Sequence, residues 1–539
     1  MDKNAIKKYA VWARRELISR VSQRALQYGV SEKEIIDADV ESVHGNLLSD
    51  AEKRQRKALV ARVKRMGYEQ TMEEAAYTWF NRFIALRFME VNGYLPTHIR
   101  VFTDEENSFK PQILAEAIHL DPETMPGLTM EKVYAYKDKN QTDELFKYLI
   151  ITQCNALINI LPGMFTRIDD YTELLFPDNI LREGSVIEQM IALIPQADWD
   201  VNTLDERGQP QGQVQIIGWL YQYYNTEPKD KVFADLKKNI KISKENIPAA
   251  TQLFTPDWIV RYMVENSLGR LWLEQLETQK VFDFGHVDFK NFSFGEDEKG
   301  SITKKQAALK SEWKYYLEEA KQDQDVEKQL YELRMSNKNY DLTTFKFIDP
   351  CMGSGHILVY AFDVFMKIYL SEGWNQREAA ASIVQNNLYG LDIDDRAAQL
   401  AYFAVMMKAR QYDRRFFTRG IQPHVHAIID SEWTGGAYQH DMGNFLLSKE
   451  HQETLNYLLD VFRDAKEYGS IMQLEDRDYA GLADAWKYTA SQTAENVNMT
   501  LWYSAVESIV PQLIQQAIML SQKYDVVVTN PAGNYGLTA

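Results

Sequence analysis

The 539-residue sequence predicts an α/β fold with a doubly wound parallel sheet, preceded by a mainly helical domain. Residues 347–369 read as an apolar strand, a turn of small residues and an amphipathic helix. A second apolar stretch begins near Leu388, after room for another helix at 375–385, and the chain before about Asn239 is mainly helical in pattern. Strands that alternate with helices indicate a parallel sheet.

The small-residue turn indicates a nucleoside cofactor. Gly353 and Gly355 let backbone amides approach a polar ligand, and the helix that follows adds partial positive charge. Asp392 ends the second predicted strand, where an acid accepts the hydroxyls of a ribose. The sequence motif that binds a nicotinamide dinucleotide needs a third glycine, where this chain has Leu358. It also needs an acid only about 20 residues further on, and Asp392 lies beyond that spacing. The sequence also lacks a G-K-[ST] phosphate loop, so a nucleoside without pyrophosphate, S-adenosylmethionine, fits better.

The amino-acid composition excludes several classes of protein. A hydrophobic content of 45% and a charged content of 25% are those of an ordinary globular protein, and the length allows two to four domains. The net charge of −17 is opposite to that of a general nucleic-acid binder, so DNA contact needs a local basic face or a segment outside this chain. Cys154 and Cys351 lie far apart, which indicates neither a disulfide framework nor a zinc site and favours a cytoplasmic location. No apolar run reaches the roughly 18 residues of a membrane span.

The predicted helical domain covers residues 1–240. Its segment 51–65 is strongly basic with a narrow apolar stripe, which fits a solvated helix face better than a phosphate-contacting face. The aromatic-rich segments 78–84 and 219–224 are more typical of a core than of a base-stacking platform. Turn signals at 177–184 and 205–212 indicate loops within this domain.

The second predicted domain covers residues 241–539 and begins with a hinge at 241–256. The charged stretch at about 285–339 is expected to be a helical surface insertion. A helix is expected at 397–410, and a third strand at 424–430 that ends in Asp430. His424 and His426 alternate on that strand, but no third ligand is nearby, so structural histidines are favoured over a metal pair and no metal is expected.

Four motifs together resemble those of DNA adenine methyltransferases whose cofactor motifs precede the catalytic one. D-P-C-M-G-S-G-H at 349–356 and Y-G-L-D-I-D at 389–394 resemble motifs I and II, Q-L-F-T-P at 252–256 resembles motif X, and the stretch 524–531 resembles the strand entering the N-P-P-Y loop of motif IV. Segments 4–17 and 216–225 further resemble the PglX (BrxX) family of BREX phage-defence systems. This resemblance implies a Rossmann-like S-adenosylmethionine-dependent methyltransferase domain that is C-terminally incomplete.

The resemblance also implies roles for individual residues. Thr255 and Pro256 would lie near the methionine end of the cofactor, and Thr255 is also able to cap the helix that follows, with Pro256 in its first turn. The remaining cofactor-binding residues would be Asp349, Gly353 and Gly355 at the turn, Asp392 at the ribose, Ile393 against the adenine ring and Asp430 facing its amino group.

In such enzymes the target adenine is flipped out of the duplex and its amino group donates to the Asn side chain and the first Pro carbonyl of N-P-P-Y. Asn530 and Pro531 would be these acceptors. Ala532 and Gly533 replace the second Pro and the stacking Tyr, and Tyr535 lies two positions late. The chain ends soon after, at Ala539, so we expect an N-terminal portion or an altered product of a larger enzyme, with little or no transferase activity alone.

The expected function is therefore site-specific DNA adenine-N6 methylation in a BREX system. The expected partners are double-stranded DNA, contacted mainly through a missing C-terminal region, other BREX proteins and a phage-encoded inhibitor, without a membrane. Ala532 and Gly533 leave open an alternative hypothesis, in which the chain is a catalytically silent scaffold that binds the cofactor. Transfer to a protein glutamine is a third hypothesis, against which the long helical N-terminal half argues.

Overall fold

The computed structural model describes residues 1–165, 170–206, 208–238, 240, 255–284, 287–288, 293–294, 300–431, 447–492 and 509–531. The chain forms two compact units, each described by itself. The first comprises Met1–Lys241 with Met406–Gly420, and the second comprises Ile242–Val405 with Ile421–Ala539. Residues 406–420, predicted from the sequence to lie in the second domain, pack in the first unit, where the Arg410 guanidinium lies over the Tyr94 ring and Gln411 donates to the carbonyl of Val201.

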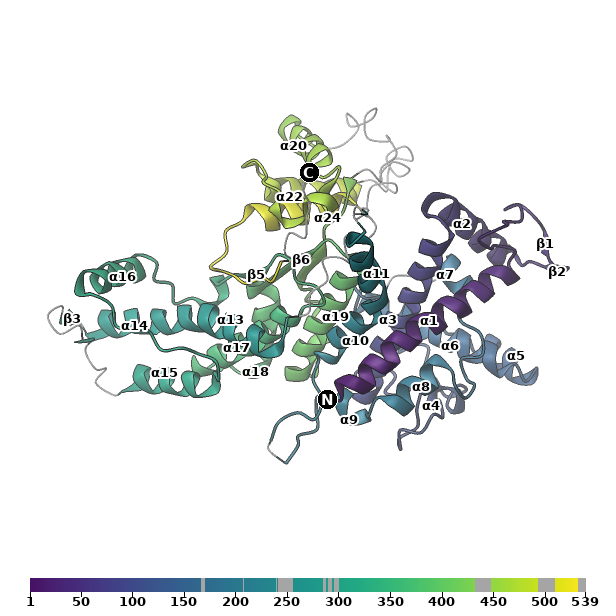
Figure 1. The fold of residues 1–539 in the computed structure, drawn as a ribbon, viewed down its shortest axis with the longest axis horizontal. Helices are drawn as coiled ribbons and strands as arrows, with labels where there is room; N and C mark the ends of the chain where they lie inside the picture. The colour runs from purple at the N-terminus through teal and green to yellow at the C-terminus, as the bar shows by residue number, and fades with distance from the viewer. Residues whose placement is uncertain are drawn as a thin grey trace. The chain divides into compact units, whose positions relative to one another are not determined.

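The described part of the first unit is built mainly from helices. Its elements are α1 (Lys3–Gln27), β1 (Ser42–Val43), β2 (Asn46–Leu47), α2 (Asp50–Met66), α3 (Tyr68–Val91), α4 (Gln112–Ala115), α5 (Met130–Asp138), α6 (Thr142–Ala156), η1 (Leu157–Asn159), α7 (Tyr171–Leu174), α8 (Val186–Leu193), α9 (Gln196–Trp199), α10 (Ile216–Tyr224), α11 (Thr226–Leu236) and η6 (Phe416–Arg419). Helix α1, purple in Figure 1, packs against α3, α8 and α10.

Helix α3 supplies the centre of this unit. Trp79, Phe80 and Phe83 are fully buried, and the Phe80 ring lies 4.4 Å from that of Tyr224 on α10. The prediction that the two aromatic-rich segments form a core is therefore confirmed for these side chains. Burying such rings removes large apolar areas from water, which stabilises the unit.

The basic stretch on α2 is largely used within the fold. Arg56 is buried and donates to the carbonyl oxygens of Tyr28 and Ile36 at 2.7 Å and of Asp37 at 2.6 Å. Lys57 pairs with Asp39, and Arg62 pairs with Glu74. A solvated face is thus the wrong description for Arg56, because its guanidinium satisfies three carbonyl groups of the loop after α1.

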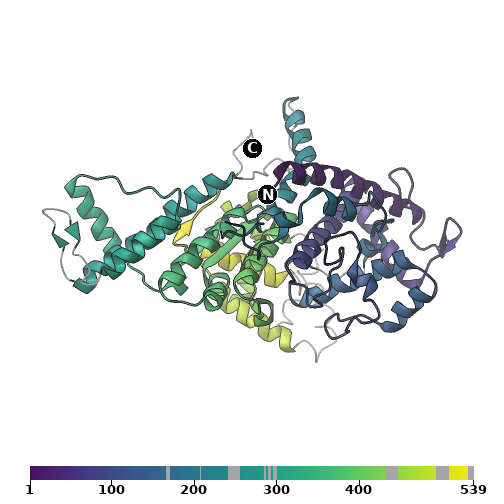
Figure 2. The same ribbon diagram turned by 90° about the horizontal axis from the view of Figure 1, so that it is seen from below.

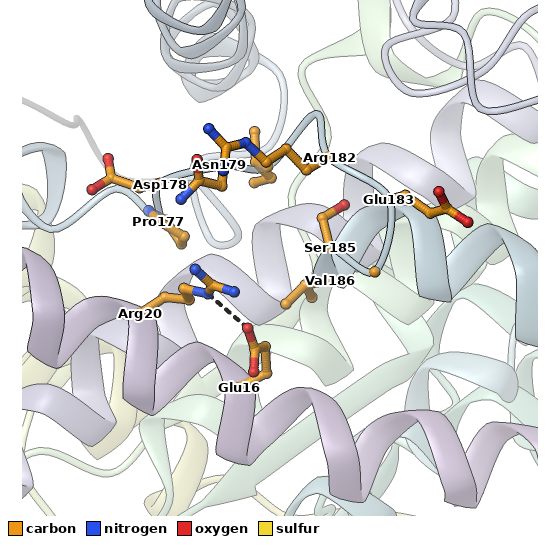
Figure 3. A pocket seen from close by; sticks show the side chains of 11 residues that line it. Glu16, Arg20, Pro177, Asp178, Asn179, Arg182, Glu183, Ser185 and Val186 are labelled. Atoms are coloured by element: carbon orange, nitrogen blue, oxygen red, sulfur yellow. Dashed lines mark hydrogen bonds and ion pairs between the residues drawn. The ribbon is translucent and has the colours of Figure 1, made fainter.

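A shallow hollow lies between α1 and the turn before α8 (Figure 3). It is lined by both acids and bases, and Arg20 pairs with Glu16 at 2.6 Å. Ser185, which directly precedes α8, accepts a hydrogen bond from the backbone amide of Glu188 with its side chain. The helix start is thus already capped from within the unit.

The second unit carries a parallel sheet between helices. Its described elements are α13 (Asp257–Val264), η3 (Glu265–Gly269), α14 (Arg270–Phe284), β3 (Val287–Asp288), β4 (Ser293–Phe294), α15 (Ser301–Glu312), α16 (Gln324–Ser336), η4 (Leu342–Thr344), β5 (Phe347–Asp349), α17 (His356–Ser371), α18 (Gln376–Ser382), η5 (Ile383–Asn387), β6 (Leu388–Asp392), α19 (Asp395–Tyr412), β7 (His424–Ala427), α20 (Lys449–Val461), α21 (Ala465–Tyr468), η9 (Gly469–Ile471), α22 (Tyr479–Gln492), α24 (Val510–Ser521) and β8 (Val526–Val527).

The sheet has the strand order β7-β6-β5-β8, and every neighbouring pair is parallel. The predicted α/β class with a parallel sheet is confirmed. The chain runs outward from β5 through β6 to β7 and then returns to the other side of β5, so the order reverses between β5 and β8. In open parallel sheets, ligands bind outside the carboxyl ends of the strands at such a reversal. Asp349 ends β5, and Asn530 follows β8.

Helices cover both faces of this sheet, and β6 shows why. Tyr389 and Leu391 point to one face, where they join a buried cluster with residues of α20, α22 and α24. Gly390 points to the other face, where a Cβ atom would lie 2.6 Å from Leu358 of α17. Figure 1 accordingly shows α22 and α24 on one side of β5 and β6, and α17 on the other.

The charged stretch predicted as an insertion contains α15 and α16. Together with α14 these helices extend away from the sheet in both Figure 1 and Figure 2. Gln306 of α15 donates to the carbonyl of Leu273, and Lys305 pairs with Glu372 after α17. These contacts fix α15 to the body of the unit.

Candidate functional site

The glycine turn between β5 and α17 is tied to the end of β6. Gly353 and Gly355 have φ values of +53° and +83°, which residues with a side chain rarely adopt. The amide of Gly353 donates to Oδ2 of Asp392 at 2.8 Å, and the amide of Met352 donates to the carbonyl of Leu391 at 3.0 Å. A Cβ atom on Gly355 would lie 3.0 Å from Cα of Ala401, so this position needs glycine for space as well.

Asp349, at the end of β5, is fully buried. Its Oδ1 accepts the amide of Cys351 at 3.2 Å, whereas Oδ2 has no hydrogen-bond partner among the described residues. Burial raises the pKa of Asp349 to about 7, although the nearby Thr529 hydroxyl and the Cys351 amide oppose this rise. A buried acceptor without a partner is costly, and a cationic ligand would relieve that cost.

Asp392, at the end of β6, accepts two backbone amides. Besides Gly353 at Oδ2, the amide of Asp394 donates to Oδ1 at 2.9 Å. Burial raises the pKa of Asp392 to about 6, although these backbone hydrogen bonds act in the opposite direction. Each carboxylate oxygen can accept more than one hydrogen bond, so the group keeps capacity for the hydroxyls of a ribose.

A hydrogen bond joins the segment after β8 to the segment before α13. Nδ2 of Asn530 lies 3.1 Å from Oγ1 of Thr255, and Nδ1 of His356 lies 3.1 Å from the carbonyl oxygen of Thr255. Thr255 is buried, while Pro256 and Pro531 are exposed. The two predicted catalytic residues thus follow the strand beside Asp349, and Thr255 contacts Asn530. Ala532, Gly533, Tyr535 and 252–254 lie outside the described residues.

The prediction that Thr255 caps the helix is wrong. Helix α13 begins at Asp257, its capping position is Pro256, and no side chain makes a cap hydrogen bond there. The Thr255 hydroxyl contacts the Asn530 amide instead, one position too early for capping.

Ile393 and Asp430 lie on the side of β6 that faces away from α17. Ile393 is partly buried against the cluster of α20, α22 and α24, and its Cγ2 lies 3.2 Å from where Gly469 would carry a Cβ atom. Asp430 accepts the amide of Lys466 at 2.8 Å, close to the start of α21. The predicted third strand is shorter than expected, because β7 ends at Ala427 and Asp430 lies beyond it.

His424 and His426 have surroundings typical of structural histidines. Nε2 of His424 lies 2.9 Å from the carbonyl of Gln385, and its ring stacks on Tyr389 at 4.6 Å. Burial lowers the pKa of His426 to about 4. Within the described ranges, no cluster of three or more His, Cys, Asp and Glu could hold a metal ion.

The residues at this edge of the sheet fit a nucleoside that carries positive charge. A partnerless buried carboxylate oxygen suits an ammonium or sulfonium group, and the Gly353 turn with Asp392 suits a ribose. Sequence reasoning missed His356 and Asp394, which hold Thr255 and Asp392. The position of His356, directly after the second turn glycine, was the available signal. No described helix is both long and apolar enough to cross a bilayer.

Residues 317–426 match the DNA-methyltransferase domain of MmeI, and residues 386–532 match the Eco57I restriction-modification methylase. These matches and the parallel sheet fit the class of α/β DNA methyltransferase domains. The chain is 37% identical to adenine-specific methyltransferase PglX of Lacticaseibacillus casei (strain Zhang) and 35% identical to adenine-specific methyltransferase BrxX of Escherichia coli O9:H4 (strain HS), over 98% of its length in each case. The chain is thus PglX/BrxX-like, and it spans 42% of the length of each of these relatives.

Proposed function

We propose that this chain forms the cofactor-binding and catalytic-loop part of a site-specific DNA adenine-N6 methyltransferase of a BREX-type phage-defence system. The observation that carries the proposal is the contact between Asn530 and Thr255, at the point where the strand order reverses and beside the buried carboxyl of Asp349. The finer proposal is a Rossmann-like, doubly wound domain over residues 241–539 after a helical N-terminal domain over residues 1–240.

In this proposal, S-adenosylmethionine supplies the methyl group when it is bound. Asp349 faces the positive charge of the methionine end together with Thr255 and Pro256, and the amides at Gly353 and Gly355 approach the ligand. Asp392 accepts the ribose hydroxyls, Ile393 packs on the adenine ring of the cofactor, and Asp430 accepts from its amino group.

The chain's own contribution to transfer is positioning and polarisation. The Asn530 side chain and the Pro531 carbonyl accept hydrogen bonds from the target amino group, so that electron density shifts toward the nitrogen that is methylated. Acceptors held in place before the reaction need no reorganisation during it, which is where such sites gain most of their rate.

The proposal also names a substrate, partners and a location. Double-stranded DNA is the substrate, with other BREX proteins as partners, a phage-encoded inhibitor as a further partner and the cytoplasm as the location. Four of the seven cations on α2 already have partners within the fold, which favours a DNA contact elsewhere than this helix: Lys53, Lys57 and Arg62 pair with acids, and Arg56 binds carbonyl groups.

The loop sequence predicts low transfer by the chain as it stands. Gly533 stands where the family carries a stacking ring, and a base loses about 1–3 kcal/mol without such a ring. The test measures N6-methyladenine in plasmid DNA, by mass spectrometry of nucleosides, after incubation with S-adenosylmethionine. It compares the chain as it is, a variant with Ala532→Pro and Gly533→Tyr, and the same variant with Asn530→Ala.

We expect methylation to be low in the first case, higher after the double substitution and lost again without Asn530. Cofactor binding without methylation in all three would favour the silent scaffold, which the Ala532 and Gly533 residues already favour on sequence. Methyl groups on protein glutamine and none on DNA would contradict the proposal.

A further inference from the structure

The His356 side chain connects the glycine turn to the segment before α13. It is the first residue of α17, directly after Gly355, and only 8% of it is exposed. Its Nδ1 lies 3.1 Å from the carbonyl oxygen of Thr255. Because a carbonyl oxygen only accepts, this ring nitrogen carries the hydrogen.

Asp257 of α13 faces the other side of the ring, and Arg261 of the same helix pairs with Asp257. Nε2 of His356 lies 3.6 Å from Oδ1 of Asp257, and Oδ2 of Asp257 accepts from Nε of Arg261 at 2.7 Å. The contact with His356, together with Arg261, lowers the pKa of Asp257 to about 2. The Arg261 guanidinium lies over the Tyr360 ring, which also belongs to α17. The imidazole is therefore hydrogen-bonded at Nδ1, while its Nε2 faces the Asp257 carboxylate.

Thr255 connects His356 to Asn530, in the loop after β8. While its carbonyl accepts from His356, its hydroxyl accepts from Nδ2 of Asn530 at 3.1 Å. With Nδ2 directed at Thr255, Oδ1 of Asn530 is left as an acceptor, and no described residue donates to it. We infer that His356 is a positioning residue that, through Thr255, holds the Asn530 side chain with its oxygen presented to the target amino group, an inference that rests on the proposed function.

The arrangement also links two sites that are far apart in sequence. The same residue that ends the cofactor turn sets the place of the proposed catalytic amide, 275 residues from Thr255. A structural histidine of the sheet offers a matched comparison. His424 also contacts a carbonyl, that of Gln385 at 2.9 Å, but none of its described contacts leads to Asn530.

The test follows the side-chain amide of Asn530 by NMR in the full chain labelled with 15N-asparagine. The signal pair is assigned by its loss in Asn530→Asp. His356→Asn places an amide nitrogen near the position of Nδ1 and should keep the signal, whereas His356→Gln places it near Nε2 and should not. We expect about fivefold faster hydrogen exchange of the Asn530 amide in His356→Gln and in Thr255→Val, the ratio typical of one lost hydrogen bond. His424→Gln should leave the signal unchanged.

Two results would overturn the inference: an unchanged Asn530 signal in His356→Gln, or an equal change in His424→Gln. Circular dichroism checks that each variant is folded. If His356→Gln does not fold, a comparison of Thr255→Ser with Thr255→Val tests independently whether the Thr255 hydroxyl holds the Asn530 amide. Titration with S-adenosylmethionine separates the two proposals. Absence of binding to the wild-type chain contradicts the proposed function, while the amide signal still decides the role of His356.

Discussion

Substitution of Asp349 by Asn tests the electrostatics of the site in both binding and stability. Its pKa is raised from 3.8 to about 7 because the carboxyl is fully buried. A difference of about three pH units corresponds to roughly 4 kcal/mol between the two protonation states. If a cationic ligand binds beside the ionised carboxylate, its affinity should rise about tenfold per pH unit below about pH 7 and level off above it.

The sign of the stability effect follows from the same shift. Between about pH 4 and pH 7 the folded chain keeps a proton that the unfolded chain has released. The stability that this proton contributes is complete below pH 4 and is lost as the pH rises through 7. The amide side chain in the variant cannot titrate, so the stability of Asp349→Asn relative to the wild type should increase from pH 4 to pH 8, by at most about 4 kcal/mol.

Two measurements check these values: calorimetric titration with S-adenosylmethionine between about pH 5.5 and 8, and urea unfolding between about pH 4 and 8. Asp484→Asn on α22 is the control, because that side chain is 84% exposed and should show no such change. The reasoning is refuted if the wild-type affinity does not depend on pH, or if Asp349→Asn retains the wild-type pH dependence.

Three further predictions concern stability. Gly355→Ala should lower the free energy of unfolding in urea by about 1–3 kcal/mol more than Gly373→Ala does. Both residues have positive φ, but only Gly355 would press a Cβ atom onto Ala401, so equal costs would contradict this. Arg56→Ala should lower the free energy of unfolding by at least about 3 kcal/mol, because three carbonyl groups lose their donor. In the same unfolding assay, Lys57→Ala, which removes an exposed side chain, should lower it by under about 1 kcal/mol. The pKa of His426 is lowered, so its protonation opposes folding and the wild type should lose stability as the pH falls from 6.5 toward 4. His426→Gln should lose less stability over this range. Identical acid unfolding curves for the two proteins would count against burial of His426 as the cause.

Local patterns in the sequence were enough to predict the strands and the helix around the glycine turn. The strand, glycine turn and helix at 347–369 and the second strand at 388–392 follow from apolar runs and glycine positions, and they agree with β5, α17 and β6. Asp430 shows the limit of such patterns. Apolar alternation continues from His424 to Asp430, but β7 can pair only as far as β6 extends, and Asp392 pairs with Ala427.

Other features depend on contacts that spacing does not encode. The contact of Asn530 with Thr255 joins residues 275 positions apart. Helical periodicity described the charge run on α2, but it could not show that Arg56 is buried beneath a loop whose carbonyl groups need a donor. The raised pKa of Asp349 likewise comes from burial by the surrounding fold.

The central claim is that the carboxyl ends of β5 and β6 form a pocket for S-adenosylmethionine. Calorimetric titration of this cofactor into the wild-type chain and into Asp392→Ala tests it most directly. The account predicts binding to the wild type and its loss in the variant, which loses the carboxylate that accepts the Gly353 amide. Equal binding to both, or no binding to the folded wild-type chain, would contradict the claim.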